Sequence, residues 1–216
     1  MKKDFYDASG FMVDTDIEEI KNLKPPVENF SIKKETFEWI DVIIVAVITV
    51  IIIFGLLFRV ATISGDSMLN TLVDKEKVVI TNFLYTPKRG DIIVISRNIE
   101  NSAQYNSQVH GPIIKRVIAT ENQTVDIDFE KGIVYVDGIA LKEDYISTPT
   151  TVMHDVEFPV TVPKGHIFVL GDNRTVSLDS RSSSIGTNGM VDTRYVLGHA
   201  VFRIFPFNKI GRLDNK

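Results

Sequence analysis

An uninterrupted apolar run from Val42 to Phe58 constrains this chain more than any other feature of its sequence. The run, VIIVAVITVIIIFGLLF, contains no charged residue, and Thr49 is its one polar side chain. Its seventeen residues would cover about 25 Å as a helix, close to the lower limit for crossing the hydrocarbon of a bilayer. Trp39 extends the run with an aromatic anchor for the membrane interface. We therefore predict a transmembrane anchor over residues 39–58, in preference to a buried core helix.

The charges around this run predict its orientation. Three lysines lie within residues 24–34, whereas Arg59 is the one basic residue close behind the run. Positive charge is retained on the cytoplasmic side, so the N-terminus should be cytoplasmic. A cleaved secretory signal is the alternative, but its charged region and apolar core would both be unusually long. We expect residues 1–38 to be a flexible cytoplasmic tail and residues 59–216 to form an extracytoplasmic domain at the cell membrane.

Composition excludes several functions. Residues 59–216 carry 18 Lys/Arg and 18 Asp/Glu, and without a basic run they are a poor surface for nucleic acid. The absence of cysteine rules out disulfides, thiolate metal sites and cysteine nucleophiles. The four histidines are scattered and form no HExxH pair, so we expect no metal and no other cofactor. The sequence does not indicate an oligomeric state.

Short β-branched runs separated by turn residues follow the anchor. The runs predicted as strands are 77–80, 91–96, 113–119, 124–127, 133–136, 156–162, 166–170 and 199–204. Asp137-Gly138 between two such runs predicts a tight hairpin. No helix longer than about two turns is apparent after residue 60, which disfavours parallel α/β folds. We predict a mostly β protein, in which one transmembrane helix precedes a β-rich domain.

The first candidate for chemistry is Ser67, in the segment SGDSMLNTL. Gly65 stands two residues before it, and a serine so placed can occupy a tight turn whose backbone N–H groups face a cleft, as an oxyanion requires. Taken alone the pattern is weak. The second glycine of GxSxG is replaced by Leu69, and exposed turn serines are mostly structural.

The second candidate is Lys115, in the apolar run PIIKRVIA. In a strand, Ile113, Lys115 and Val117 share one face, while Ile114 and Arg116 share the other. The lysine either snorkels out from a sheet edge or lies in an apolar pocket. In a pocket, desolvation favours the neutral amine, which can act as a base. Periodicity alone favours snorkelling.

The third candidate is the polar segment GDNRTVSLDSR at residues 171–181, which directly follows the apolar run 166–170. One interpretation is a solvated turn. The other is a self-bonded loop that positions a base in a neighbouring strand.

Behind a single membrane anchor, the motifs Ser-Gly-Asp-Ser-Met, Lys-Arg-Val-Ile and Gly-Asp-Asn-Arg-x-x-Ser-x-Asp-Ser-Arg occur in an order that resembles the type I signal peptidases. The resemblance covers about residues 40–205. It implies a membrane-anchored serine endopeptidase of mostly antiparallel β-fold that removes signal peptides from exported preproteins and cuts after small residues. It further implies Ser67 as the nucleophile, Lys115 as the general base and Ser177 as the hydroxyl that orients the lysine.

The same resemblance extends to supporting residues and partners. The Gly-x-Ser pattern itself predicts Gly65 and Ser67 as the turn that forms the oxyanion site. Some members of the family have a serine where this chain has Gly65, so only backbone donors would remain on that side. The residues implied as structural support are Asp172, Asn173, Arg174, Asp179 and Arg181. We expect substrate pockets near Ile63, Met68 and Ile113, and we expect signal peptides and membrane lipid as partners.

The sequence departs from the family pattern at Asn70, where proline is usual. His110 lies outside the lysine run, so a histidine base is disfavoured. A self-cleaving repressor peptidase is disfavoured by the membrane span. A catalytically silent relative that binds substrate or assists assembly of a surface polymer such as a pilus is disfavoured because Ser67, Lys115 and Ser177 are all present.

Overall fold

The computed structural model of the protein describes residues 5–6, 12–13, 32–96 and 111–213. Most of the predicted tail 1–38, with its expected flexibility, and the excluded base His110 lie outside these residues. Two short strands near the N-terminus, β1 (Phe5–Tyr6) and β2 (Met12–Val13), pair antiparallel.

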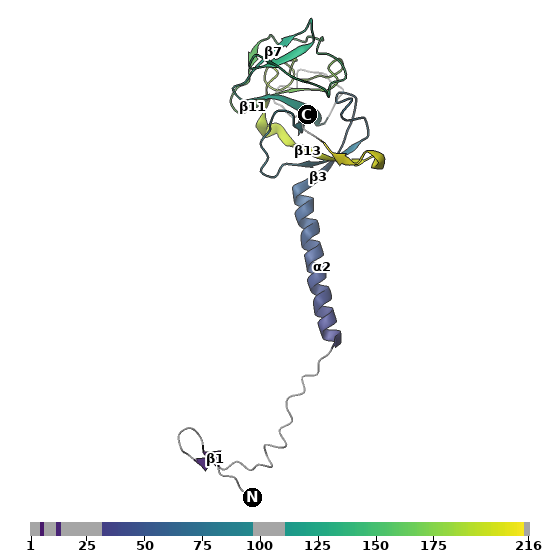
Figure 1. Ribbon diagram of the computed structural model, residues 1–216, viewed down its shortest axis with the longest axis vertical. Helices are drawn as coiled ribbons and strands as arrows, with labels where there is room; N and C mark the ends of the chain where they lie inside the picture. Colours follow the sequence, from purple (N-terminus) through teal and green to yellow (C-terminus); the bar gives the residue numbers. More distant parts are fainter. Residues whose placement is uncertain (1–4, 7–11, 14–31, 97–110, 214–216) are drawn as a thin grey trace. The chain divides into compact units, whose positions relative to one another are not determined.

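One long helix in the described residues, α2 (Ile32–Leu57), contains the predicted anchor (Figure 1). Its section Trp39–Leu57 has a mean hydropathy of 3.1, none of it is buried, and it is long and apolar enough to cross a membrane. Thr49 Oγ1 donates to the carbonyl of Val45 at 2.7 Å, so the helix satisfies its own polar side chain. The helix begins earlier than the predicted anchor because residues 32–38 contain good helix formers.

Helix α2 ends one residue before Phe58, the predicted end of the anchor. Phe58 is the first residue of β3 (Phe58–Thr62), and its backbone pairs with Thr81 in β4 (Lys77–Thr81). The run of apolar letters continues into this strand, so composition alone could not separate helix from strand.

The larger sheet has eight strands in the order β12-β11-β6-β5-β13-β4-β3, with β14 paired to β13. All of its pairs are antiparallel. Its other strands are β5 (Ile92–Ile95), β6 (Ile113–Thr120), β11 (His166–Leu170), β12 (Val191–Asp192), β13 (Val196–Phe205) and β14 (Gly211–Arg212). Short 3-10 turns, η2 (Thr193–Tyr195) and η3 (Phe207–Lys209), flank β13. The prediction of a mostly β, antiparallel fold behind one apolar helix is confirmed.

A smaller antiparallel sheet has the order β10-β7-β8-β9. Its strands are β7 (Thr124–Asp128), β8 (Ile133–Val136), β9 (Ile139–Ala140) and β10 (Val160–Thr161). The predicted hairpin is present: Asp137 (φ 53°) and Gly138 (φ 77°) connect β8 to β9 as a two-residue turn. Positive φ at both positions is what this kind of turn requires.

Two details of the predicted strands are wrong. The run 156–162 forms a strand only at Val160–Thr161, because Pro159 has no N–H for a ladder bond, and Val156 instead donates its N–H to Arg181 O at 3.1 Å. The strands β12 and β14, of two residues each, were not predicted, since so short a segment carries no period.

Strand β6 lies between β11 and β5, at the centre of the larger sheet. Its apolar side chains enter three clusters of buried residues found in the described part of the chain. Ile114 packs in the first cluster with Met68, Ile118 in the second with Phe168, and Val117 in the third with Ile93. A residue in the middle of β6 is therefore enclosed by packed side chains.

Candidate active site

Ser67 lies in a tight turn between β3 and β4. Within this turn Leu69 N donates to Asp66 O at 3.2 Å, and Leu72 N donates to Met68 O at 2.8 Å. Gly65 has φ +84°, a conformation that a side chain would strain, and its N–H donates to Asp74 Oδ1 at 3.0 Å. The turn leaves Ser67 half-buried, with its hydroxyl directed to the neighbouring strand β6.

Lys115 of β6 meets this serine. Its Nζ lies 2.9 Å from Ser67 Oγ and donates to the carbonyl of Ile114 at 3.0 Å. Only 3% of Lys115 is exposed, so the interpretation that it snorkels is wrong. Lys115 belongs to the central strand β6, whose residues 114–119 are all buried. Burial of this kind disfavours the charged form of an amine.

Ser177 lies close to the turn of Ser67, and the absence of a side chain at Gly171 leaves room for it. A Cβ added at Gly171 would lie 2.2 Å from Ser177 Oγ and 2.5 Å from Ser67 O. Ser177 is buried, and its Oγ has no hydrogen-bond partner among the residues that the structure describes. The structure therefore brings Ser177 to the site, while its predicted role in orienting Lys115 stays a prediction.

Hydrogen bonds connect the loop 171–181 to the turn of Ser67. Asn173 donates its backbone N–H to Ser67 O at 3.0 Å and its Nδ2 to Asp66 O at 3.2 Å. The predicted supporting role of Asn173 thus has a geometric basis, because two hydrogen bonds hold the loop against the turn.

Asp172 connects this loop to β6. Its carboxylate accepts from Arg116 Nε at 2.8 Å and from Arg116 Nη2 at 2.7 Å, in a fully buried bidentate pair. Thr71 Oγ1, four residues after Ser67, donates to the same carboxylate at 2.5 Å. The Arg116 guanidinium also lies 4.0 Å from the centroid of the Tyr145 ring. Burial, with a smaller contribution from the charge of Glu143, raises the pKa of Tyr145.

Two further arginines hold the loop from within. Arg181 forms a buried pair with Asp179 at 2.9 Å and donates to the carbonyls of Arg174 and Ser177. Arg174 donates its Nε to Gly171 O at 3.0 Å and pairs with Glu143 at 2.5 Å. Burial alone would lower the pKa of Arg174, but its hydrogen bonds to Glu143 raise it. The solvated-turn interpretation of this segment is therefore wrong.

The three residues expected near substrate pockets do not form one group. Ile63 and Met68 are 3% and 0% exposed and belong to the first apolar cluster. Ile113 is half-buried and packs against the third cluster. A contact between these residues and a substrate stays a prediction.

Sequence reasoning missed Arg116, Thr71 and Glu143. Arg116 and Thr71 lie within the motifs, and a charged residue in an apolar strand was a usable signal for Arg116. Glu143 lies 31 positions from Arg174 in a segment without a recognisable pattern. In the described ranges no group of three or more His, Cys, Asp or Glu could hold a metal ion.

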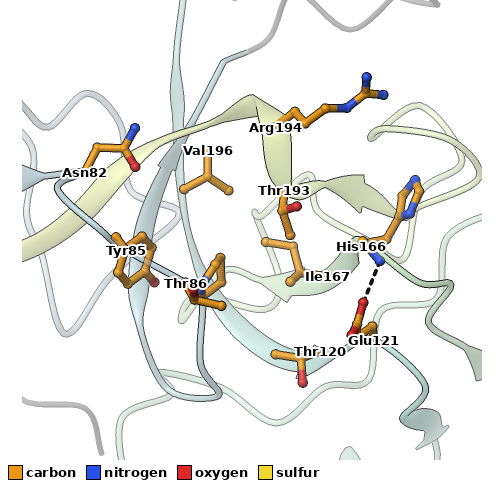
Figure 2. A pocket seen from close by; sticks show the side chains of 12 residues that line it. Asn82, Tyr85, Thr86, Thr120, Glu121, His166, Ile167, Thr193, Arg194 and Val196 are labelled. Carbon is orange, nitrogen blue, oxygen red and sulfur yellow. Dashed lines mark hydrogen bonds between the residues drawn. The ribbon is translucent and has the colours of Figure 1, made fainter.

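A separate pocket of about 520 Å³ lies between residues 82–87 and the start of β11 (Figure 2). It is lined by Tyr85 and Val196 on an apolar side and by Glu121 and His166 on a polar side. Glu121 accepts from the backbone N–H of Gly165 at 2.8 Å. Neither Ser67 nor Lys115 lines this pocket.

A serine hydroxyl beside a buried lysine on an antiparallel β-domain is an arrangement found in serine peptidases that do not use histidine. Residues 36–205 match the family described as signal peptidase, peptidase S26. The chain belongs to this family. It is a serine peptidase, and with its apolar helix it is a membrane signal peptidase.

Individual relatives agree. The chain is 34% identical over 192 residues to signal peptidase I of Bacillus licheniformis, covering 84% of this chain and 95% of the relative. It is 36% identical over 182 residues to probable signal peptidase I-1 of Synechocystis sp., covering 82% and 87%. A crystal structure of a signal peptidase I from Enterococcus faecalis V583 aligns with a TM-score of 0.39 and 28% identity, over 53% of this chain and 97% of that chain.

Proposed function

We propose that the protein is a Ser/Lys endopeptidase that removes signal peptides from preproteins, with Ser67 as the nucleophile and Lys115 as the general base. The observation that carries this proposal is the 2.9 Å separation of Ser67 Oγ and Lys115 Nζ, together with the burial of the lysine. A base must lie within hydrogen-bond reach of the proton that it takes, and its neutral form must be accessible.

The mechanism follows from this pair. The neutral amine of Lys115 takes the proton of Ser67 Oγ as that oxygen attacks the scissile carbonyl. The resulting ammonium protonates the departing amine, which leaves an acyl-enzyme on Ser67. Water, deprotonated by the same lysine, then releases the signal peptide and regenerates the serine.

The oxyanion that forms during attack needs backbone donors. The N–H of Gly65 already donates to Asp74, so we assign this role to the N–H of Ser67. Gly65 contributes through its positive φ, which shapes the turn. A preorganised donor of this kind is worth about 3 kcal/mol of transition-state stabilisation.

The substrate and the arrangement in the membrane complete the proposal. A preprotein segment can add to the β-domain in extended form, so its first and third residues before the cut face the same side. We propose small residues at both positions. We further propose that residues 1–38 are cytoplasmic, that 39–58 correspond to the anchor and that 59–216 work outside the cytoplasm, with membrane lipid around the anchor.

Cleavage of a signal-peptide-bearing preprotein by the full-length protein in detergent tests the proposal. Ser67→Ala and Lys115→Ala should each reduce single-turnover cleavage by on the order of 10³-fold or more, because the two groups act as a unit. Ser64→Ala, an exposed serine three residues earlier, is the matched control and should retain activity. Substantial cleavage by the Ser67→Ala protein would refute the assignment of the nucleophile.

A further inference from the structure

A second site lies where the helix passes into the β-domain. A cleft of about 260 Å³ is lined by residues from the end of α2, from β3 and β4, and from the segments that follow β4 and begin β13. Its lining residues are Leu56, Leu57, Arg59, Ile80, Asn82, Phe83 and Leu197. The cleft shares no residue with the Ser67 turn or with β6.

The chemistry of the cleft is amphipathic. Five of its seven lining residues are apolar, none is acidic, and Arg59 is the one charged group. Arg59 and Ile80 are paired across β3 and β4, so their side chains share one face of the sheet. Arg59 is exposed, and no carboxylate in the described part of the chain pairs with it. Its guanidinium is therefore available for an external anion.

The position of the cleft along the chain indicates where that anion comes from. Arg59 follows Leu57, the last residue of the candidate span, by two positions. Whichever way the helix crosses a bilayer, this end lies at headgroup level. Phe83 is 64% exposed and Leu84 is 89% exposed, so apolar surface continues outward from the cleft. Apolar side chains beside a cation at this depth match a lipid better than a soluble anion.

We propose that the cleft binds one phospholipid, with its phosphate on Arg59 and its glycerol and first acyl carbons against Phe83 and Leu56. The guanidinium can engage two phosphate oxygens in a bidentate contact, and the Asn82 amide lines the same cleft. The acyl chains extend along the outer, exposed surface. This site is independent of the peptidase chemistry proposed for Ser67.

The test uses purified full-length protein in a non-ionic detergent and short-chain phosphatidylglycerol as the probe, with binding measured by calorimetry. Arg59→Gln should weaken binding by about fivefold or more. Arg59→Lys should also weaken it, because lysine keeps the charge but loses the bidentate contact. Arg212→Gln is the matched control: Arg212 is exposed on β14, lies outside the cleft and should leave binding unchanged.

A second experiment tests whether the apolar residue Phe83 contributes to lipid binding. Phe83→Ser should weaken binding of the lipid and leave the weak binding of glycerol phosphate unchanged. Each of these variants should still cleave a preprotein, which also shows that it folds, and Ser67→Ala should still bind the lipid. The proposal is overturned if the wild type binds no lipid, or if glycerol phosphate binds to it as tightly as the lipid does. It is also overturned if Arg59→Lys binds the lipid as well as the wild type, or if Arg59→Gln and Arg212→Gln weaken binding equally.

Discussion

At the residue scale, the reactivity that we propose for Ser67 depends on whether Lys115 carries a proton. The lysine is enclosed in a central strand, with Ser67 Oγ and Ile114 O around its amine. A buried amine loses its proton more readily than an exposed one because the low-dielectric surroundings solvate the ammonium poorly. In the proposed mechanism, the 2.9 Å contact with Ser67 Oγ places the resulting lone pair where the serine proton must go.

Activity should therefore increase from pH 6 to alkaline pH as Lys115 becomes neutral. Lys115→Arg should be inactive throughout this range, because a guanidinium does not deprotonate. Single-turnover cleavage measured at each pH tests both expectations, and His110→Ala is the control that should keep the wild-type profile. A flat wild-type profile, or a folded Lys115→Arg protein with near-normal turnover, would contradict the assignment of the base.

Gly171 is a second position where one added side-chain atom should disturb the site. A Cβ there would overlap Ser177 Oγ at 2.2 Å and Ser67 O at 2.5 Å, and both contacts are too short for any neighbour to absorb without moving. Gly171→Ala should lower the free energy of unfolding by about 1–3 kcal/mol and reduce kcat by roughly tenfold or more, since a small misplacement of catalytic groups has a large effect.

Gly211→Ala is the control for this change. No atom lies within 4 Å of a Cβ placed at Gly211, and its φ is not positive. Thermal unfolding and preprotein cleavage should both remain close to wild type. Equal effects of the two substitutions would show that the crowding at Gly171 is not what limits the site.

At the scale of elements, the site depends on how the loop 171–181 is fastened to β6. The Arg116–Asp172 pair is fully buried, and Thr71 joins it from the turn of Ser67. Three segments that are distant in sequence are therefore held by one carboxylate. A buried pair of this kind need not add net stability, but removal of one partner leaves an uncompensated charge.

Asp172→Asn should lower the free energy of unfolding by about 3 kcal/mol or more and should reduce cleavage, because Arg116 is then left without its counter-charge. Denaturant unfolding of the full-length protein in detergent measures the first effect. The control is Asp192→Asn, which breaks the exposed pair of Asp192 with Arg194, a residue whose side chain is 84% exposed. Surface pairs of this kind contribute at most about 1 kcal/mol. A loss at Asp172 no larger than that at Asp192 would contradict the role of the buried pair.

At the scale of the whole molecule, the helix and the β-domain meet within one residue. Leu57 ends α2 and Phe58 begins β3, which is the edge strand of the larger sheet and pairs with β4 along its full length. A fragment that keeps the complete sheet must therefore begin at Phe58 rather than inside β3.

A fragment from Phe58 to Lys216 should keep cleavage of a short peptide substrate and lose efficiency on a preprotein embedded in lipid, since the anchor no longer holds it at the bilayer. A fragment beginning at Ile63 lacks β3 and should unfold at lower temperature, because β4 then becomes an unprotected edge. Peptide cleavage and thermal unfolding of the two fragments test this. Equal stability of both would show that β3 is dispensable for the domain.

Local patterns in the sequence were sufficient for much of this protein. The apolar run predicted the helix, alternation and β-branched residues predicted most strands, and Asp137-Gly138 predicted its hairpin. The order of three motifs indicated the family and pointed to Ser67 and Lys115. Each of these signals is carried by neighbouring residues, whose preferences act before any tertiary contact forms.

Tertiary structure alone decided the environment of Lys115 and the pairing of Arg116. Periodicity favoured a snorkelling lysine because the alternation of residues within one strand does not reveal which strands lie beside it. In the structure β6 lies between β11 and β5. Ser67 and Lys115 are 48 positions apart, and Arg116 and Asp172 are 56 apart. Contacts over such separations depend on strand order and on which loops close over the sheet. Burial is set by these long-range contacts. The same local sequence could place its lysine in an exposed strand at a sheet edge or in a buried strand at the centre.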